Sequence, residues 1–293
     1  MKPRVLALIA VVFWSTAASA FKLTLSWMTP YQLVLLATAV STVALWTMIL
    51  FRRKRFIEAG SWRNAIAKSA VRGLLNPFLY YLVLLEAYNE LPAQIAMVIN
   101  YLWPVVLIIL SAPLLKQRIT LKMAAASGIS FCGIGVLALG GNPVGGQLPL
   151  LAIGLALLST VIWALFWILN IRASGDAVRN LAESFIFGLL YLVIYGVISG
   201  KIPSIRGLDI HGIIGSIYIG LFEMGITFVI WYKALELSET TSEVGNLIYL
   251  TPFMALVFIG SVVGEKIGLW TIAGLLLVIS GIALQGMGKR SNV

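Results

Sequence analysis

The chain has 293 residues, of which 60% are hydrophobic and 11% are charged, and its formal net charge is +10. Soluble domains carry about 25% charged residues, so a soluble globular fold is excluded because it would leave too much apolar surface in water. The lipid bilayer is therefore the expected solvent of the chain. The basic residues of the chain are expected to orient it in the membrane and not to bind nucleic acid.

Ten apolar segments follow one another along the chain, each about as long as a helix must be to cross the hydrocarbon core. The runs are continuous, which favours helices over the short alternating strands of a membrane barrel. We therefore predict an all-α polytopic membrane protein with ten transmembrane helices. The expected spans are residues 4–21, 30–51, 70–88, 92–115, 121–140, 149–171, 181–200, 211–233, 242–262 and 267–287.

The first segment also has features of a cleavable signal peptide, because Lys2 and Arg4 precede it and the small residues 18–20 lie near its end. We assign it to the protein as its first span, because the internal repeat described next requires it. Lys and Arg concentrate in the loops of one side, as in the run 52–55, and cytoplasmic loops carry such an excess. We expect a multi-pass protein of the inner or plasma membrane with both termini in the cytoplasm.

Similar residues recur at a nearly constant spacing in the two halves of the chain. Tyr101 to Pro104 recurs as Tyr249 to Pro252, and Trp14 in the first span corresponds to Trp163 in the sixth. Five spans is an odd number, so a second copy must enter the membrane in the opposite orientation. We predict two inverted five-helix repeats, residues 1–144 and 145–293. Such repeats can open in turn to either side of the membrane around one central site.

With this organisation, the sequence resembles the drug/metabolite transporter superfamily and its ten-helix EamA-type exporters. The residues that carry the resemblance are Trp14, Trp163, Pro104, Pro252 and the run Gly264 to Ile267, and the segment Asn100 to Pro104 is most similar to the aromatic amino-acid exporter branch. The resemblance implies export of amino acids or related metabolites by exchange or proton coupling, without ATP hydrolysis. Gln117 departs from the family, which has an acidic residue there, whereas Glu265 keeps it in the second half.

Glu223 most strongly indicates a polar site within the membrane. It lies near the middle of the eighth predicted span, where a carboxylate is costly unless it is paired, protonated or in contact with water. Two interpretations remain open: a site for a substrate amine or a coupling proton, and a structural bond to a neighbouring helix. The repeat pairs Glu223 with Asn76 in the third span, and we expect both to face one cavity.

Aromatic and amide side chains within the spans predict a pocket that stacks on aromatic or apolar cargo. The alternative for any one ring is packing in the belt at the membrane surface. The expected substrate-binding residues are Trp14, Asn76, Tyr80, Asn100, Tyr101, Trp103, Trp163, Glu223 and Tyr249, and the same aromatic set includes Tyr81, Trp167, Phe228 and Trp231.

Two prolines lie at matching positions in the fourth and ninth spans. Pro104 and Pro252 each remove a backbone donor, here from the middle of a predicted helix. We expect paired bends that gate the two sides, and the alternative is a static kink in each span. Near the ends of spans, Lys22 extends to the lipid headgroups, pairs with a group such as Glu86 or contacts a substrate carboxylate. Arg72 is expected to be a surface anchor.

The chain has one cysteine and one histidine, and no phosphate-binding loop or pair of catalytic carboxylates on one helix, so we expect no enzyme, metal or cofactor. The first hypothesis is a secondary transporter that exports amino acids, aromatic ones preferred, by alternating access. The second is the same fold exporting drugs or other metabolites, and an intramembrane enzyme or a scaffold or receptor is less favoured. The expected partners are a small-molecule substrate and the lipid bilayer, and coupling of transport to protons is one alternative. The protein is expected to be a monomer or a loose homodimer.

Overall fold

The computed structural model describes residues 2–51, 62–116, 120–140, 147–171, 173–202, 207–238 and 244–286, and all regular structure in these ranges is helical. The first half contains α1 (Pro3–Leu25), α2 (Pro30–Phe51), α3 (Trp62–Gly73), η1 (Leu74–Leu79), α4 (Tyr80–Glu90), α5 (Ala93–Asn100), α6 (Trp103–Leu115) and α7 (Leu121–Leu139). The second half contains α8 (Leu150–Ile171), α9 (Ala177–Ser199), α10 (Ile210–Tyr218), η3 (Ile219–Glu223), α11 (Ile226–Leu237), η4 (Asn246–Leu250), α13 (Thr251–Phe258), η5 (Ile259–Val263) and α14 (Leu269–Gly286). The predicted boundary between residues 144 and 145, the basic run 52–55 and Gln117 lie outside the described residues.

The described helices join into ten spans, which confirms the predicted all-α membrane fold. Seven spans are long and apolar enough to cross a membrane, and α7 and α14 contribute two shorter apolar helices. The remaining span is α3, η1 and α4, which begins at Trp62 and not at residue 70 as predicted. Its first turns contain polar residues such as Arg63 and Lys68, which hide a helix from any reading based on apolar runs.

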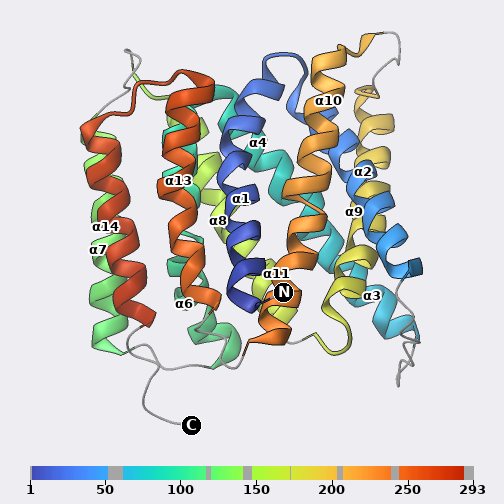
Figure 1. The fold of residues 1–293 in the computed structure, drawn as a ribbon, viewed down its shortest axis with the longest axis horizontal. Helices are drawn as coiled ribbons and strands as arrows, with labels where there is room; N and C mark the ends of the chain where they lie inside the picture. Colours follow the sequence, from blue (N-terminus) through green and yellow to red (C-terminus); the bar gives the residue numbers. More distant parts are fainter. Residues whose placement is uncertain are drawn as a thin grey trace.

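The spans stand side by side in one bundle (Figure 1). The pair α7 and α14 lies at one edge and α2, α3 and α9 lie towards the other, with α1 between them, packed on α10, α11 and α13. The beginning of α1 and the end of α14 lie at the same end of the bundle in this view, as ten crossings require. Which side of the membrane that end faces stays a prediction.

Four spans are interrupted, at corresponding places in the two halves. The third span breaks at η1, where Asn76 has non-helical dihedrals (φ −144°, ψ 120°), and the eighth breaks after η3, where Gly225 has φ −113° and ψ −91°. The fourth span breaks at the turn before α6, and the ninth contains the 3₁₀ helix η4 before α13. Backbone groups that leave a helical ladder in lipid must be buried in protein or line a wet cavity, so these breaks mark the polar part of the bundle.

The breaks correct the prediction for the two prolines. Pro104 and Pro252 lie in the first turn of α6 and of α13, where a backbone N–H would have no helical partner and proline costs no hydrogen bond. Neither proline lies in the middle of a regular α-helix, because the turn at residues 101–102 precedes Pro104 and the 3₁₀ helix η4 precedes Pro252. Their role in gating stays a prediction.

The last helices of the two halves pack closely on each other. A side-chain carbon on Gly133 of α7 would lie 2.6 Å from the Gly274 carbonyl oxygen of α14, and one on Gly274 would lie 2.8 Å from the Gly133 carbonyl oxygen. Glycine at both positions therefore lets the two backbones approach. The Ser130 hydroxyl of α7 also donates to the Val278 carbonyl of α14 at 3.0 Å.

Candidate functional site

Glu223, the last residue of η3, lies among aromatic side chains of the first half. Its Oε1 accepts a hydrogen bond from the Tyr81 hydroxyl at 3.3 Å, and its backbone carbonyl accepts one from the Trp14 indole N–H at 3.3 Å. Its Oε2 is buried and has no hydrogen-bond partner among the described residues. This carboxylate therefore retains one oxygen that can accept a proton or an amine.

Trp163 of α8 is the centre of an aromatic cluster. Its ring stacks on Tyr80 of α4 with 4.4 Å between centroids and 27° between planes. It also contacts Phe166, Trp167 and Phe228, with centroid distances of 5.3, 6.0 and 6.2 Å. Trp163 is only 8% exposed, so its indole is a packed wall and not a ring of the membrane-surface belt.

Phe228 of α11 connects this cluster to Trp14 of α1. The Trp14 ring lies 5.3 Å from Phe228 and 5.4 Å from Trp231, in edge-on and tilted arrangements. The two tryptophans that the repeat pairs therefore both contact one phenylalanine. Aromatic rings form a continuous path from α1 through α11 to α8.

Asn100, at the end of α5, joins the aromatic cluster to a polar group on α8. Its Oδ1 accepts from the Tyr80 hydroxyl at 3.3 Å, and its Nδ2 donates to the Ser159 hydroxyl oxygen at 3.0 Å. Ser159 lies one helical turn before Trp163, so the two side chains share a face of α8. The break between α5 and α6 places this amide beside the rings.

Contacts thus bring together five of the predicted site residues, namely Trp14, Tyr80, Asn100, Trp163 and Glu223. Trp103 is reached indirectly, because it stacks with Trp167 at 6.1 Å. Tyr101 and Tyr249 are half-buried against the same apolar core. Asn76 is fully buried, and neither polar atom of its side chain has a partner in the described part of the chain. That Asn76 and Glu223 share one cavity stays a prediction.

Two contributors were absent from the predicted site. Tyr81 belongs to the predicted aromatic set, but the direction of its hydroxyl depends on where η3 lies and has no signal in the sequence. Ser159 has one signal, its spacing of one turn from Trp163. A small serine in an apolar helix is common, however, and it becomes informative only once Asn100 is known to face it.

At the end of the bundle opposite the termini, two charged side chains hold the turn between α4 and α5. The Lys22 amine donates to the carbonyl oxygens of Tyr88 at 2.9 Å and Leu91 at 2.8 Å, and it does not pair with Glu86. Glu265 accepts from the backbone N–H of Ala93 at 2.6 Å and Gln94 at 3.2 Å. The cation thus lies at a helix C-terminus and the carboxylate at a helix N-terminus, as the helix dipoles favour.

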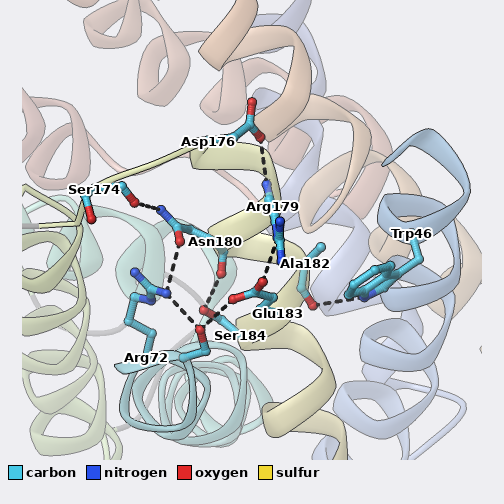
Figure 2. A network of polar contacts seen from close by, with 10 residues as sticks. Trp46, Arg72, Ser174, Asp176, Arg179, Asn180, Ala182, Glu183 and Ser184 are labelled. Carbon is cyan, nitrogen blue, oxygen red and sulfur yellow. Dashed lines mark hydrogen bonds and ion pairs between the residues drawn. The ribbon is translucent and has the colours of Figure 1, made fainter. Parts of the chain in front are cut away.

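Arg72 is not the surface anchor that the sequence suggested, because it is only 5% exposed. It belongs to a network between α3 and α9 (Figure 2). Its Nη2 donates to the Ser69 hydroxyl at 2.9 Å and to Asn180 Oδ1 at 3.2 Å, and the Ser69 hydroxyl donates to Glu183 at 2.8 Å. Glu183 also pairs with Arg179 at 2.9 Å, so one carboxylate connects the Ser69–Arg72 pair to a second arginine.

A cavity of about 480 Å³ opens between α1, α10 and η5, at the same end as the Lys22 turn. Its walls are mostly apolar, and the hydroxyls of Thr16 and Tyr218, 2.6 Å apart, form a polar spot in it. Phe13, Phe222 and Tyr218 pack together between this cavity and the Glu223 turn, with centroid distances of 4.8 and 5.1 Å.

The EamA-like transporter family matches the chain twice, over residues 1–139 and 150–287. Each matched segment contains five of the described spans. An uncharacterized transporter of Archaeoglobus fulgidus is 25% identical over 96% of this chain and 98% of its own length, and the uncharacterized transporter YvbV of Bacillus subtilis is 24% identical over 96% and 90%. A solved crystal structure has 19% identity and a TM-score of 0.65 over 99% of both chains, which shows a shared fold.

Proposed function

Because the chain belongs to the EamA-like transporter family, we propose that it is a secondary active transporter that exports amino acids or related small metabolites, aromatic ones preferred. The observation that carries this proposal is the meeting of one carboxylate with a stacked aromatic cluster, between helices of both matched segments. The carboxylate of Glu223 suits a cargo ammonium, and the stacked rings of Trp163 and Tyr80 suit an aromatic side chain.

Asn100 completes the recognition of an amino acid in this proposal. Its side chain both donates and accepts, and it already bonds the Tyr80 hydroxyl that edges the aromatic cluster. Ligand sites in membrane and soluble proteins commonly combine such apolar walls with a few polar groups that orient the ligand. Exchange of its bonds from Ser159 and Tyr80 to the cargo would orient a carboxylate or amino group.

Alternating access is supported by the position of the breaks. In transporters, discontinuous helices near the membrane centre form the site around which the two halves of the protein rock. Here the third and eighth spans are both broken, and the halves that contain them match one family. In this proposal the turns before Pro104 and Pro252 bend to open opposite sides, in an inner or plasma membrane with both termini cytoplasmic.

Coupling is assigned to Glu223. A proton and a cargo ammonium both neutralise a buried carboxylate, and a carboxylate in lipid surroundings is costly without one of them. Binding of either would therefore exclude the other, so that release of cargo on one side is followed by uptake of a proton from that same side, and the proton moves in the opposite direction to the cargo. Tyr81 keeps the carboxylate oriented during both occupancies.

Reconstituted vesicles test this proposal. Vesicles loaded with unlabelled phenylalanine should take up labelled phenylalanine faster than unloaded ones, and a pH difference across the membrane should change that rate. Labelled lysine is the matched control for a cargo without a ring. Absence of exchange for every amino acid, together with exchange of an aromatic cationic drug, would contradict the amino-acid assignment.

The second candidate function is export of drugs or other apolar metabolites by the same fold. The cavity between α1, α10 and η5 favours it, because its walls are mostly apolar and its polar groups are few and include the Thr16 and Tyr218 hydroxyls. The vesicle experiment separates the two candidates, since the drug and the amino acid are tested side by side.

A further inference from the structure

Two hydroxyl side chains on α2 face no hydrogen-bond partner. Thr38 and Ser41 are both 0% exposed, and neither hydroxyl oxygen is bonded within the described residues. The buried hydroxyl of Ser15, by contrast, donates to the Val11 carbonyl of its own helix at 2.6 Å. The hydroxyls of Thr38 and Ser41 remain available for a ligand, because an unbonded buried hydroxyl is costly.

The broken eighth span brings carbonyl oxygens to the same place. A side-chain carbon on Gly225 would lie 2.9 Å from the Gly220 carbonyl oxygen, 3.1 Å from the Ser41 hydroxyl oxygen and 3.3 Å from the Leu221 carbonyl oxygen. Three oxygens from two spans therefore converge on Gly225, so closely that a side chain at this position would crowd them. Gly220 allows this approach, since a side chain there would meet the Ala37 carbonyl of α2.

The hydrogen-bond ladder of the span changes at these carbonyls. The Met224 amide bonds the Ile219 carbonyl at 3.0 Å, one residue further back than in an α-helix, and Gly225 then leaves helical dihedrals. Carbonyl oxygens at broken membrane helices coordinate Na⁺ in several transporter folds. The carbonyls of Gly220 and Leu221 lie in such a break.

The local charge also favours a cation. Glu223 lies in the same turn as these carbonyls, and its Oε2 is buried without a partner among the described residues. Neither α2 nor η3 contains a lysine or arginine. Uncharged oxygens with a single carboxylate nearby match one monovalent ion, whereas a divalent ion is usually held by more carboxylates.

We propose that this protein binds one Na⁺ between α2 and the break of the eighth span. The ligands are the hydroxyls of Thr38 and Ser41 and the carbonyls of Gly220 and Leu221, and Glu223 supplies the compensating charge. The site goes beyond the proposed cargo, and because Glu223 also serves coupling in the proposed function, Na⁺ binds while this carboxylate carries neither a proton nor a cargo ammonium. Bound Na⁺ fixes the break against α2, so that occupancy is linked to the arrangement of the eighth span.

Thermal unfolding of the purified full chain in detergent, without cargo, tests the site. NaCl is titrated against choline chloride at constant ionic strength, and KCl is a second comparison. At roughly ten times its Kd, Na⁺ should raise Tm by about 3 °C, and the rise should saturate. Potassium should match choline.

Two variants assign the effect to these residues. Ser41→Ala should lose the rise in Tm caused by Na⁺, and Thr38→Val should do the same if Ser41→Ala does not fold. Ser111→Ala is the matched control, because Ser111 is buried on α6 and its hydroxyl bonds the Leu107 carbonyl at 2.6 Å; its Na⁺ response should equal the wild type. The proposal would be overturned by equal Tm values in Na⁺ and choline, or by a rise in Tm equal to that of the wild type in both α2 variants. Either result would indicate that water, and not Na⁺, occupies this site.

Discussion

The third and eighth spans occupy corresponding places in the two halves, and they break alike but carry different chemistry. The third breaks at Asn76, a neutral amide buried without a partner in the described residues, whereas the eighth breaks just after Glu223, which is bonded by Tyr81 and Trp14. A repeated backbone interruption thus supports two different environments. The second half contributes the charge, and the first half contributes most of the groups that surround it.

The paired tryptophans differ in the same way. Trp163 is stacked on Tyr80, while Trp14 meets Phe228 edge-on and Trp231 at a tilt and donates to the Glu223 backbone. One ring is a stacking surface and the other braces the charged turn. Two residues that match in sequence have therefore taken separate tasks, and substitutions can test whether the separation is real.

The largest expected effect is that of Glu223→Gln. Gln keeps an acceptor for Tyr81 but loses the charge, so coupled exchange should fall by at least roughly tenfold, about 1.4 kcal/mol in the barrier, with its pH dependence lost. Flux in vesicles between pH 6 and pH 8 measures both the rate and its pH dependence. No carboxylate with an unperturbed pKa titrates in this range. Asn76→Gln is the control in the other break. Wild-type pH dependence in Glu223→Gln would remove this carboxylate from the mechanism.

The second largest effect on transport is expected from Trp163→Ala. Loss of an aromatic stacking partner removes about 0.5–1.5 kcal/mol, so the apparent affinity for an aromatic cargo should weaken by about fivefold, while the affinity for an aliphatic one changes less. Concentration dependence of uptake for phenylalanine and leucine gives both values. Trp14→Ala is the matched variant, and the comparison fails if both substitutions weaken phenylalanine equally.

Glu265→Ala should lower stability rather than transport. It removes the carboxylate that accepts two backbone N–H groups at the start of α5, which should cost about 1–2 kcal/mol of unfolding free energy. Glu236→Ala is the control, because the Glu236 carboxylate is exposed and pairs with Lys233 at 3.1 Å, an interaction worth little. Equal Tm values for the two variants would show that the turn is held by other contacts.

Asn76→Leu is expected to have the smallest effect. It should leave stability unchanged or raise it, whereas Glu265→Ala should lower it. Replacing an unbonded buried amide by an apolar side chain of similar size should be neutral or stabilise by up to about 1 kcal/mol. Thermal unfolding measures this, with Asn76→Asp as the contrasting variant, which should destabilise. A clear loss of stability in Asn76→Leu would show that the amide is bonded after all, for instance by water.

Much of the fold was predictable, because apolar length and the repeated residues report directly on spans in a bilayer. The third span was predicted too short, since the polar turns after Trp62 carry no apolar signal. The burial of Arg72 depends on Ser69, Asn180 and Glu183 facing it across two spans, which no local pattern encodes. For the candidate site, Trp163 and Glu223 were identifiable as unusual residues, but the Tyr81 hydroxyl and the position of the breaks depend on tertiary packing.

The close packing of α7 on α14 has a consequence for how the protein is made. Gly133 and Gly274 touch through their backbones, yet the ribosome adds about 140 residues between them, which takes on the order of ten seconds. During that interval α7 stands in the membrane without the surface it will finally contact. The first five spans are thus synthesised before the helix on which α7 finally packs. A chain truncated after residue 139 would leave the glycine surface of α7 exposed to lipid and to the quality-control machinery.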